Sequence, residues 1–458
     1  MTHDIREDVA PEERLAAAEE PALWDVVDEL IGEAEFLLGQ WLAATGSLRF
    51  NLDLLQASIE PRLAAQLDAL AVGGEAVAAR VLWPTLIEDG DSSVCRRAAA
   101  GLALLWEPDG DACDRLIALL DSPAEAKLRR AIGLALRLTA RGDIVARMLR
   151  ALAAAKTIDA RADLIAALSA RGRAPHPLEA LDDLAASATD ESLSACLGAL
   201  TVVQHARDKY RSLVERCLSH PAQSVRSASL RTGLIWNLRL AWKECRTQTA
   251  AGTPSAMAWA ASLDGPETLD TLVAALERPE RCAGALFALG FTGQVVAVDA
   301  CVQHLDHEHR PTARWAVEAI SHITGLPLED DRFAQAPKPP NEEDHAGPTD
   351  QDDLEEDLTL APTEGLPNPA ADSIRAWWAE RRSSFDSQQR YLRGRSFSSA
   401  ALEATCGNWP LHRFGSIVSE IAIRTSGELV FEPLRLGYKR LVTMPTFAPR
   451  LSRPPGWR

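Results

Sequence analysis

Two stretches decide the fold: RCAGALFALGFTG at Arg281–Gly293 and TARWAVEAISHITG at Thr312–Gly325. Each follows a shorter helical pattern, ETLDTLVAAL at Glu267–Leu276 and VAVDACVQHL at Val296–Leu305. The endings Phe-Thr-Gly and Ile-Thr-Gly lie 32 residues apart, and their glycines can take the left-handed conformation that ends a helix. The region therefore predicts a repeated pair of amphipathic helices, a pattern that specifies a surface rather than a reaction.

The same spacing continues towards the N-terminus. Arg96-Arg97-Ala98 recurs as Arg129-Arg130-Ala131 after 33 residues, and Gly101-Leu102-Ala103-Leu104 recurs as Gly133-Leu134-Ala135-Leu136 after 32. This period is close to the roughly 33–34 residues of ankyrin and tetratricopeptide repeats, and shorter than the roughly 40–47 of HEAT and armadillo repeats.

Motif content favours the HEAT class over the other two. The TPLH turn of ankyrin and the Trp and Gly-Tyr pattern of tetratricopeptide repeats are missing, whereas a turn, then Leu-Arg or Val-Arg, then an Ala-Leu helix is HEAT-like. We predict an all-α fold, an α-solenoid of HEAT-like helix pairs. In it, the arginine that begins each second helix bonds the turns between repeats, and stacked pairs bury what one pair cannot.

Composition divides the chain into six parts. They are a flexible N-terminus (1–20), an N-terminal helical cap (21–90), the HEAT-like array (91–327), an acidic Pro-rich linker (328–372), a C-terminal helical block (373–443) and a disordered tail (444–458). The linker holds too little apolar surface to offset its ordering entropy. Arginines of the C-terminal block, among them Arg390, Arg413 and Arg424, suggest contact with this acidic linker.

Three motifs resemble a family of bacterial HEAT-repeat proteins of unassigned biochemistry. They are EPRLAAQLDALAVGGE at Glu60–Glu75, QRYLRGR at Gln389–Arg395 and IAIRTSG at Ile421–Gly427. Members of this family are often encoded beside type VI secretion genes and their effectors. The resemblance covers most of the chain and implies the fold and a genomic neighbourhood, but it supplies no catalytic motif and no mechanism.

Charge and hydropathy argue against several partners. The formal net charge is −17, whereas a protein whose main ligand is a phosphate backbone needs clustered Lys and Arg. Residues 1–20 lack the basic and apolar regions of a signal peptide, and no apolar run reaches the ~18 residues that span a bilayer. We therefore expect neither a nucleic-acid nor a membrane partner, and a cytoplasmic location.

The cysteines and histidines offer two candidate chemistries. Eight cysteines stand singly, mostly in apolar helical runs, and we interpret them as buried free thiols in a reducing compartment, with a disulfide framework as the alternative. His304, His307 and His309 could bind zinc or iron. Because they lie in the polar turn before Arg310-Pro311, we interpret them as a solvated turn and predict no metal and no cofactor.

The segment Leu230–Thr253 breaks the repeat rhythm. It places Trp236 and Trp242 near basic residues, namely Arg231, Arg239, Lys243 and Arg246. Trp and Arg supply much of the binding energy in protein interfaces, so this helix could recognise a partner. The simpler interpretation is that the tryptophans belong to the core and the basic residues form its solvated edge; nucleic-acid binding is a third alternative.

Enzyme signatures are missing: the sequence holds no GxSxG, P-loop, HExxH or strand-associated GxGxxG motif. We therefore expect a non-enzymatic scaffold or adaptor that binds a protein along its concave side. The second helices would line that side, around Arg97–Leu104, Arg130–Leu136, Arg226–Trp236, Cys282–Leu289 and Thr312–Ile320. The candidate partner-binding residues are Arg226, Trp236, Arg239, Trp242 and Trp315.

The resemblance implies that this partner is a type VI secretion component or an effector. Two alternatives remain open: an enzyme on an α-solenoid, such as a lyase or a DNA-repair enzyme, and an immunity protein that blocks a toxin. The oligomeric state stays undetermined by the sequence.

Overall fold

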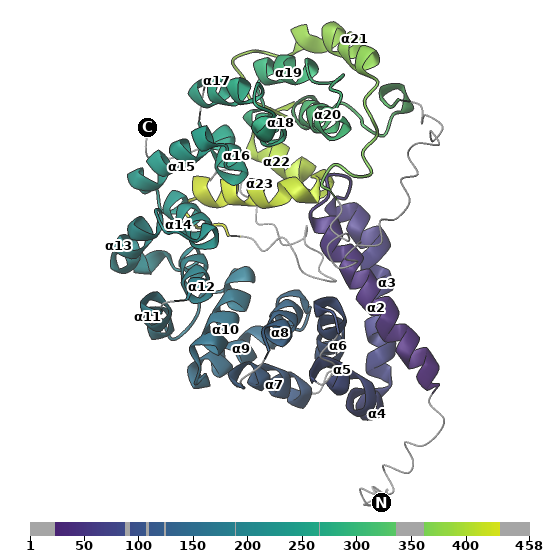
Figure 1. Ribbon diagram of the computed structural model, residues 1–458, viewed down its shortest axis with the longest axis vertical. Coiled ribbons are helices and arrows are strands. Elements are labelled where there is room, and N and C mark those ends of the chain that lie inside the picture. The colour runs from purple at the N-terminus through teal and green to yellow at the C-terminus, as the bar shows by residue number, and fades with distance from the viewer. Residues whose placement is uncertain are drawn as a thin grey trace, which may run out of the picture.

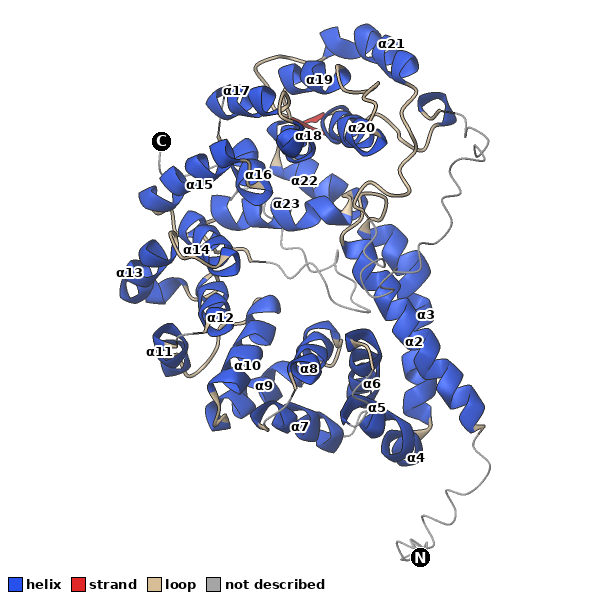
Figure 2. Ribbon diagram, viewed as in Figure 1, coloured by secondary structure: helices blue, strands red, loops and turns tan. Residues whose placement is uncertain are grey.

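The computed structural model describes residues 23–87, 92–106, 110–122, 125–187, 189–264, 266–335 and 361–430. In these residues the protein is all-α apart from one short β-hairpin, as Figures 1 and 2 show. The predicted all-α class is confirmed. The flexible N-terminus (1–20), the tail (444–458) and residues 336–360 of the acidic linker lie outside the described residues.

The N-terminal part is a long helical hairpin followed by a broken helix. Its elements are α2 (Trp24–Thr45), α3 (Leu52–Val72), α4 (Gly74–Val77), the π-helical turn η1 (Ala78–Leu82) and α5 (Trp83–Ile87). Asn51 caps α3 by accepting a 2.8 Å hydrogen bond from the amide of Leu54. All of these elements lie within residues 21–90, the range in which the sequence predicts a helical cap, and the third helical region contains the π turn.

Fifteen array helices follow in the described residues, each 8 to 15 residues long. They are α6 (Val94–Trp106), α7 (Gly110–Ala118), α8 (Ala126–Leu138), α9 (Ile144–Ala154), α10 (Ile158–Ala170), α11 (Glu179–Ala186), α12 (Asp190–Leu200), α13 (Arg207–Cys217), α14 (Gln223–Ile235), α15 (Arg239–Ala251), α16 (Pro254–Leu263), α17 (Pro266–Ala275), α18 (Pro279–Thr292), α19 (Val295–Val302) and α20 (Arg310–Thr324).

The even-numbered helices form the inner row of the array. Helices α6, α8, α10, α12 and α14 pack side by side, as do α16, α18 and α20, while the odd-numbered helices lie outside them (Figure 1). Between α14 and α16 the main connection runs through α15, which packs on both. This junction falls inside Leu230–Thr253, where the sequence breaks its rhythm.

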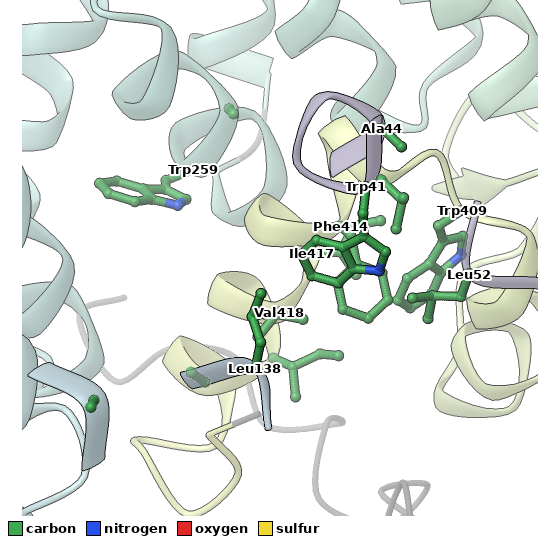
Figure 3. Packing of buried hydrophobic residues seen from close by; sticks show 14 of the residues in the cluster. Trp41, Ala44, Leu52, Leu138, Trp259, Trp409, Phe414, Ile417 and Val418 are labelled. Carbon is green, nitrogen blue, oxygen red and sulfur yellow. The ribbon is translucent and has the colours of Figure 1, made fainter. Parts of the chain in front are cut away.

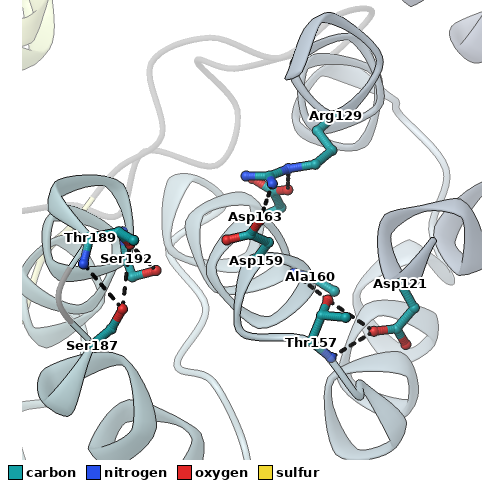
Figure 4. Close-up of polar contacts among 9 residues, drawn as sticks. All are labelled: Asp121, Arg129, Thr157, Asp159, Ala160, Asp163, Ser187, Thr189 and Ser192. Atoms are coloured by element: carbon teal, nitrogen blue, oxygen red, sulfur yellow. Dashed lines mark hydrogen bonds and ion pairs between the residues drawn. The ribbon is translucent and has the colours of Figure 1, made fainter. Parts of the chain in front are cut away.

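Arginines near the start of the inner helices tie each unit to the next. Arg129 of α8 pairs with Asp159 and, at 2.9 Å, with Asp163 of α10 (Figure 4). Arg161 of α10 donates to the carbonyl of Ala155 in the preceding turn. The expected role of the repeated arginine, bonding between units and to turns, therefore agrees with the structure.

The C-terminal block consists of α21 (Ala371–Arg381), β1 (Tyr391–Leu392), β2 (Arg395–Ser396), α22 (Ser399–Thr405) and α23 (Leu411–Arg424). The antiparallel pairing of β1 with β2 was not predicted from the sequence. The block packs on the rest of the protein, because α23 runs across the inner side of the array against α14 and α16 and reaches α2 (Figure 1).

The repeated glycines of the array support the β-hairpin. Gly293 and Gly325 have φ of +65° and +76°, which confirms the predicted left-handed helix ends. The amide of Tyr391 donates to Gly293 O at 2.7 Å, and the amide of Gly394 donates to Ile323 O at 2.9 Å. A Cβ on Gly293 would lie 2.4 Å from Tyr391 O, so the absence of a side chain allows the hairpin to dock.

A buried ion pair fixes α23 to the end of the array. The guanidinium of Arg413 bonds both carboxylate oxygens of Glu318 in α20, with Nε 2.6 Å from Oε1, and the two side chains are 0% and 2% exposed. Its Nη1 also donates to Phe287 O in α18 at 2.9 Å. A Cβ on Gly290 would lie 2.5 Å from Arg413 Nη2, so this glycine makes room for the guanidinium.

A second buried carboxylate holds the hairpin to α23. Glu420 accepts from Arg390 and from Arg424, and both arginines also donate to Ser262 O of α16. Arg390, Arg413 and Arg424 therefore pair with Glu420 and Glu318. The densest acidic runs of the linker, with which the sequence suggests contact, lie outside the described residues.

The N-terminal hairpin closes the array into a ring. The amide of Leu411 donates to Phe50 O at 2.8 Å and that of His412 donates to Ser47 O at 3.1 Å. Figure 3 shows Trp41 of α2 and Leu52 of α3 among Trp409 and Phe414 of the C-terminal block. Since α2 and α3 also pack on α6, the chain forms a continuous circuit from the first array helix to α23 and back.

Replacing Gly293 by Ala tests the docking of the hairpin. The Gly293→Ala protein should lose on the order of 2 kcal/mol of unfolding free energy, because alanine is strained at positive φ and its Cβ collides with Tyr391 O. The control Gly133→Ala, where a Cβ meets no atom within 4 Å inside α8, should gain about 0.5–1 kcal/mol. Urea unfolding measures both; equal stability of the two variants contradicts the docking role.

Replacing Arg413 by Met tests the buried ion pair. The variant should lose roughly 3–5 kcal/mol of unfolding free energy, because Glu318 stays buried without its counter-ion. The double variant Arg413→Met/Glu318→Leu should lose clearly less. Arg375→Met, which removes an exposed pair with Asp306, serves as the control and should lose at most about 1 kcal/mol in the same chemical denaturation series.

Candidate functional site

A cavity of about 940 Å³ opens on the inner side of the ring, between α8, α10, α12 and α14 of the array and α23 of the C-terminal block. We call it the central cavity. Small side chains form much of its wall, including Ala166 and Ala170 of α10, Ala195 and Gly198 of α12, and Gly415 of α23. A Cβ on Gly198 or Gly415 would meet no atom within 4 Å, so these positions leave space open. Its volume lies within the roughly 300–1,000 Å³ of ligand pockets.

Charges of both signs line the central cavity. Arg129 forms hydrogen-bonded ion pairs with Asp159 and Asp163, as Figure 4 shows. Burial raises the pKa of Asp163, although the positive charge of Arg129 opposes this rise. Exposed Arg130 and Arg137 of α8 also lie on the wall. These arginines and carboxylates give the wall a mixed, nearly balanced charge rather than a strongly basic one.

Two buried polar groups in this wall have no partner among the residues that the structure describes. Arg231 of α14 has a buried Nε without a hydrogen bond, and burial lowers the pKa of its guanidinium. The hydroxyl of Ser194 in α12 is likewise buried and unbonded. Leaving such a group unsatisfied costs about 1–3 kcal/mol, and more when it is charged. Both groups therefore remain available to a ligand in the central cavity.

The structure disperses the five residues predicted to bind a partner. Trp236 at the end of α14 is 0% exposed and Trp242 of α15 is 8% exposed, so both belong to the core, as the simpler interpretation of Leu230–Thr253 holds. Arg239 is exposed at the start of α15, and Arg226 donates to His220 O at 2.6 Å in the preceding turn. Trp315 packs between Phe287 and His412 under the C-terminal block.

Sequence reasoning grouped Arg231 with Arg239, Lys243 and Arg246 and did not single it out. In the structure Arg246 pairs with Asp264 at 3.0 Å, whereas Arg231 faces the central cavity. A signal was present in the repeat alignment. The repeated arginines are Arg129 in α8, Arg161 in α10 and Arg226 in α14. The residue five positions after each is Leu134, Ala166 and Arg231, so the third of these helices has a charged residue where the first two have apolar ones.

The three histidines of the turn before α20 form local contacts. His304 Nδ1 lies 3.2 Å from Ala300 O, His307 Nδ1 accepts from the amide of His309, and His309 Nδ1 lies 3.0 Å from Thr312 Oγ1. Within the described ranges, no three His, Cys, Asp or Glu side chains gather closely enough to hold a metal ion.

The described cysteine side chains carry free thiols. They are Cys95, Cys113, Cys196, Cys217, Cys245, Cys282 and Cys301. Burial raises the pKa of Cys196, Cys245 and Cys301 to about 12, so these thiols stay protonated at neutral pH and are poor nucleophiles.

No helix in the described part of the chain is, on its own, long and apolar enough to cross a bilayer; Leu52–Val72 and Gly74–Ile87 reach that threshold only together, across a bend of 101°. The sequence matches no protein-family model and no curated protein. The central cavity must therefore be interpreted from its own chemistry.

Two buried histidines make stability depend on pH. Burial and the nearby Arg413, Arg393 and Arg390 hold the pKa of His322 well below its usual range. Burial and Arg413 also lower the pKa of His412, against a smaller opposing effect of Glu318. In the unfolded chain both imidazoles take up a proton below about pH 6.5, while the folded protein disfavours the protonation of both. The folded state therefore loses stability as pH falls below that value.

For His322 the change from pH 7.5 to pH 5.5 should cost about 1.4 kcal/mol of unfolding free energy, and His412 should contribute a loss in the same direction. His322→Leu should remove one such contribution from the pH dependence. Ser321→Ala, which loses the neutral hydrogen bond to Leu326 O, should lower stability equally at both pH values. Urea unfolding of the three proteins at the two pH values provides the measurement; an unchanged slope in His322→Leu contradicts this assignment.

Proposed function

We propose that this chain is a cytoplasmic, non-enzymatic HEAT-like scaffold that binds another protein on the inner side of its ring. The observation that carries the proposal is the central cavity, where side chains of four array helices and α23 meet and two buried polar groups lack partners among the described residues. Helical repeat proteins use concave surfaces of this kind for binding.

The position of the C-terminal block restricts where a partner binds. The β-hairpin and α23 cover the inner side of α16, α18 and α20, so the second half of the concave surface is occupied by the chain itself. The inner side of α8, α10 and α12 borders the central cavity instead. We therefore place the partner against these three helices rather than at Trp236, Trp242 or Trp315.

The resemblance of three sequence motifs to bacterial HEAT-repeat proteins encoded beside type VI secretion genes supports a specific partner class. We propose that the partner is a type VI secretion component or an effector, and that the chain acts as its adaptor or accessory factor. The raised pKa values of the buried thiols Cys196, Cys245 and Cys301 are consistent with a non-catalytic role for these residues.

Site-specific photo-crosslinking in the native host tests this role. A photoreactive residue at Ala166, exposed in the central cavity, should crosslink to one secretion or effector protein that stays bound at moderate salt. The same residue at Leu240, exposed on α15, serves as the control and should give no such product. Mass spectrometry identifies the adduct. Equal products from both positions, or nucleic acid as the adduct, refute the proposal, and a toxin as the sole adduct indicates an immunity protein instead.

A further inference from the structure

Arg231 is a cation without a counter-ion in a wall that contains carboxylates. Asp159 and Asp163 both form ion pairs with Arg129. No ion pair or hydrogen bond joins Arg231 to any residue that the structure describes. Its Nε is buried, so water does not compensate for the missing partner at that atom. An unpaired guanidinium with a buried Nε is costly to keep, and its presence on the cavity wall needs an explanation beyond folding.

We infer that the central cavity binds a carboxylate group, with Arg231 as its counter-ion and the hydroxyl of Ser194 as a second donor. A guanidinium presents two parallel N–H donors that match the two oxygens of a carboxylate. Both groups lie on the wall of the same cavity and both are unsatisfied.

The other residues of the wall indicate how many negative charges this ligand carries and that the rest of it is apolar. Asp159, Asp163 and Glu191 line the same cavity and repel a ligand with several negative charges, such as a polyphosphate or a nucleic acid. A single carboxylate requires only one cation with a buried donor, and Arg231 supplies it. The alanines of α10 and α12, with Val418 of α23, offer apolar contacts to the body that carries the carboxylate.

A volume of about 940 Å³ accommodates more than an isolated ion. Two sources supply the same chemistry: an Asp or Glu side chain in a peptide segment of a bound protein, or a small organic acid with an apolar chain. The inference concerns the ligand's chemistry and holds whichever of the two binds, so it does not rest on the proposed scaffold role.

Matched pairs of acids and amides test the site in the full-length protein. The probes are octanoate against octanamide, and a capped pentapeptide with a central Glu against the same peptide with Gln. In calorimetric titrations at least one acid should bind about 10-fold or more tightly than its amide, as expected for a charge-assisted contact. The pair that shows the difference identifies the source, organic acid or peptide.

Three variants locate the binding. Arg231→Met should abolish the preference for acid over amide, while Arg239→Met, at an exposed arginine of α15, should retain it. Gly198→Leu should weaken all probes, because its side chain projects into the central cavity without displacing other atoms.

Thermal unfolding without any probe gives a second readout that does not depend on the choice of ligand. Arg231→Met should raise the melting temperature, because an uncompensated buried charge is removed. A lowered melting temperature means that Arg231 serves the fold and overturns the inference. Equal binding of acids and amides by the unmodified protein overturns it as well.

Discussion

The ion pair between Arg413 and Glu318 is the contact on which the closed architecture depends. Both groups are removed from water, and each retains its charge at acceptable cost only when the other lies at hydrogen-bonding distance. This requirement is met in the register of α23 on the array in which Gly290 leaves space for the guanidinium and Phe287 O accepts a third N–H from it. Once α23 takes that register, its first turn meets the loop between α2 and α3 through Leu411 and His412, and the ring is closed.

Closure of the ring changes which part of the solenoid is available for binding. An open array of this length would present a continuous concave surface, but here the C-terminal block covers α16, α18 and α20. The surface that remains is bordered by α8, α10, α12 and α23, and the small residues of these helices turn it into a cavity rather than a flat face. The same docking that stabilises the last repeats thus creates the wall that completes the central cavity.

Local regularity could be predicted from the sequence, whereas the docking of the C-terminal block could not. The 32-residue spacing, the glycines that end α18 and α20, and the arginines that tie successive units are short-range patterns, and each matches the structure. Arg413 and Glu318 lie 95 residues apart, and Arg390 contacts Ser262 O over 128 residues, so no periodicity connects them. For the same reason Trp315, exposed in a single helix pair, is covered once His412 packs on it. Arg231 could have been recognised as a deviation from the repeat, because Leu134 and Ala166 occupy the corresponding positions, but only the structure shows that it lacks a partner.

The energetics of Arg413 and Arg231 explain how a destabilising group persists in this fold. Arg413 has a bidentate carboxylate, a carbonyl acceptor and two aromatic rings within 5 Å of its guanidinium carbon, whereas Arg231 has no bonded partner among the described residues. A domain stabilised by only about 5–15 kcal/mol tolerates one unpaired charge only if other contacts are strong. The ion pairs of Arg413 with Glu318 and of Arg390 and Arg424 with Glu420 supply such contacts where α23 meets the array. Charged contacts therefore hold α23 to the last repeats, while Arg231 and Ser194 leave unsatisfied polar atoms on the wall of the central cavity.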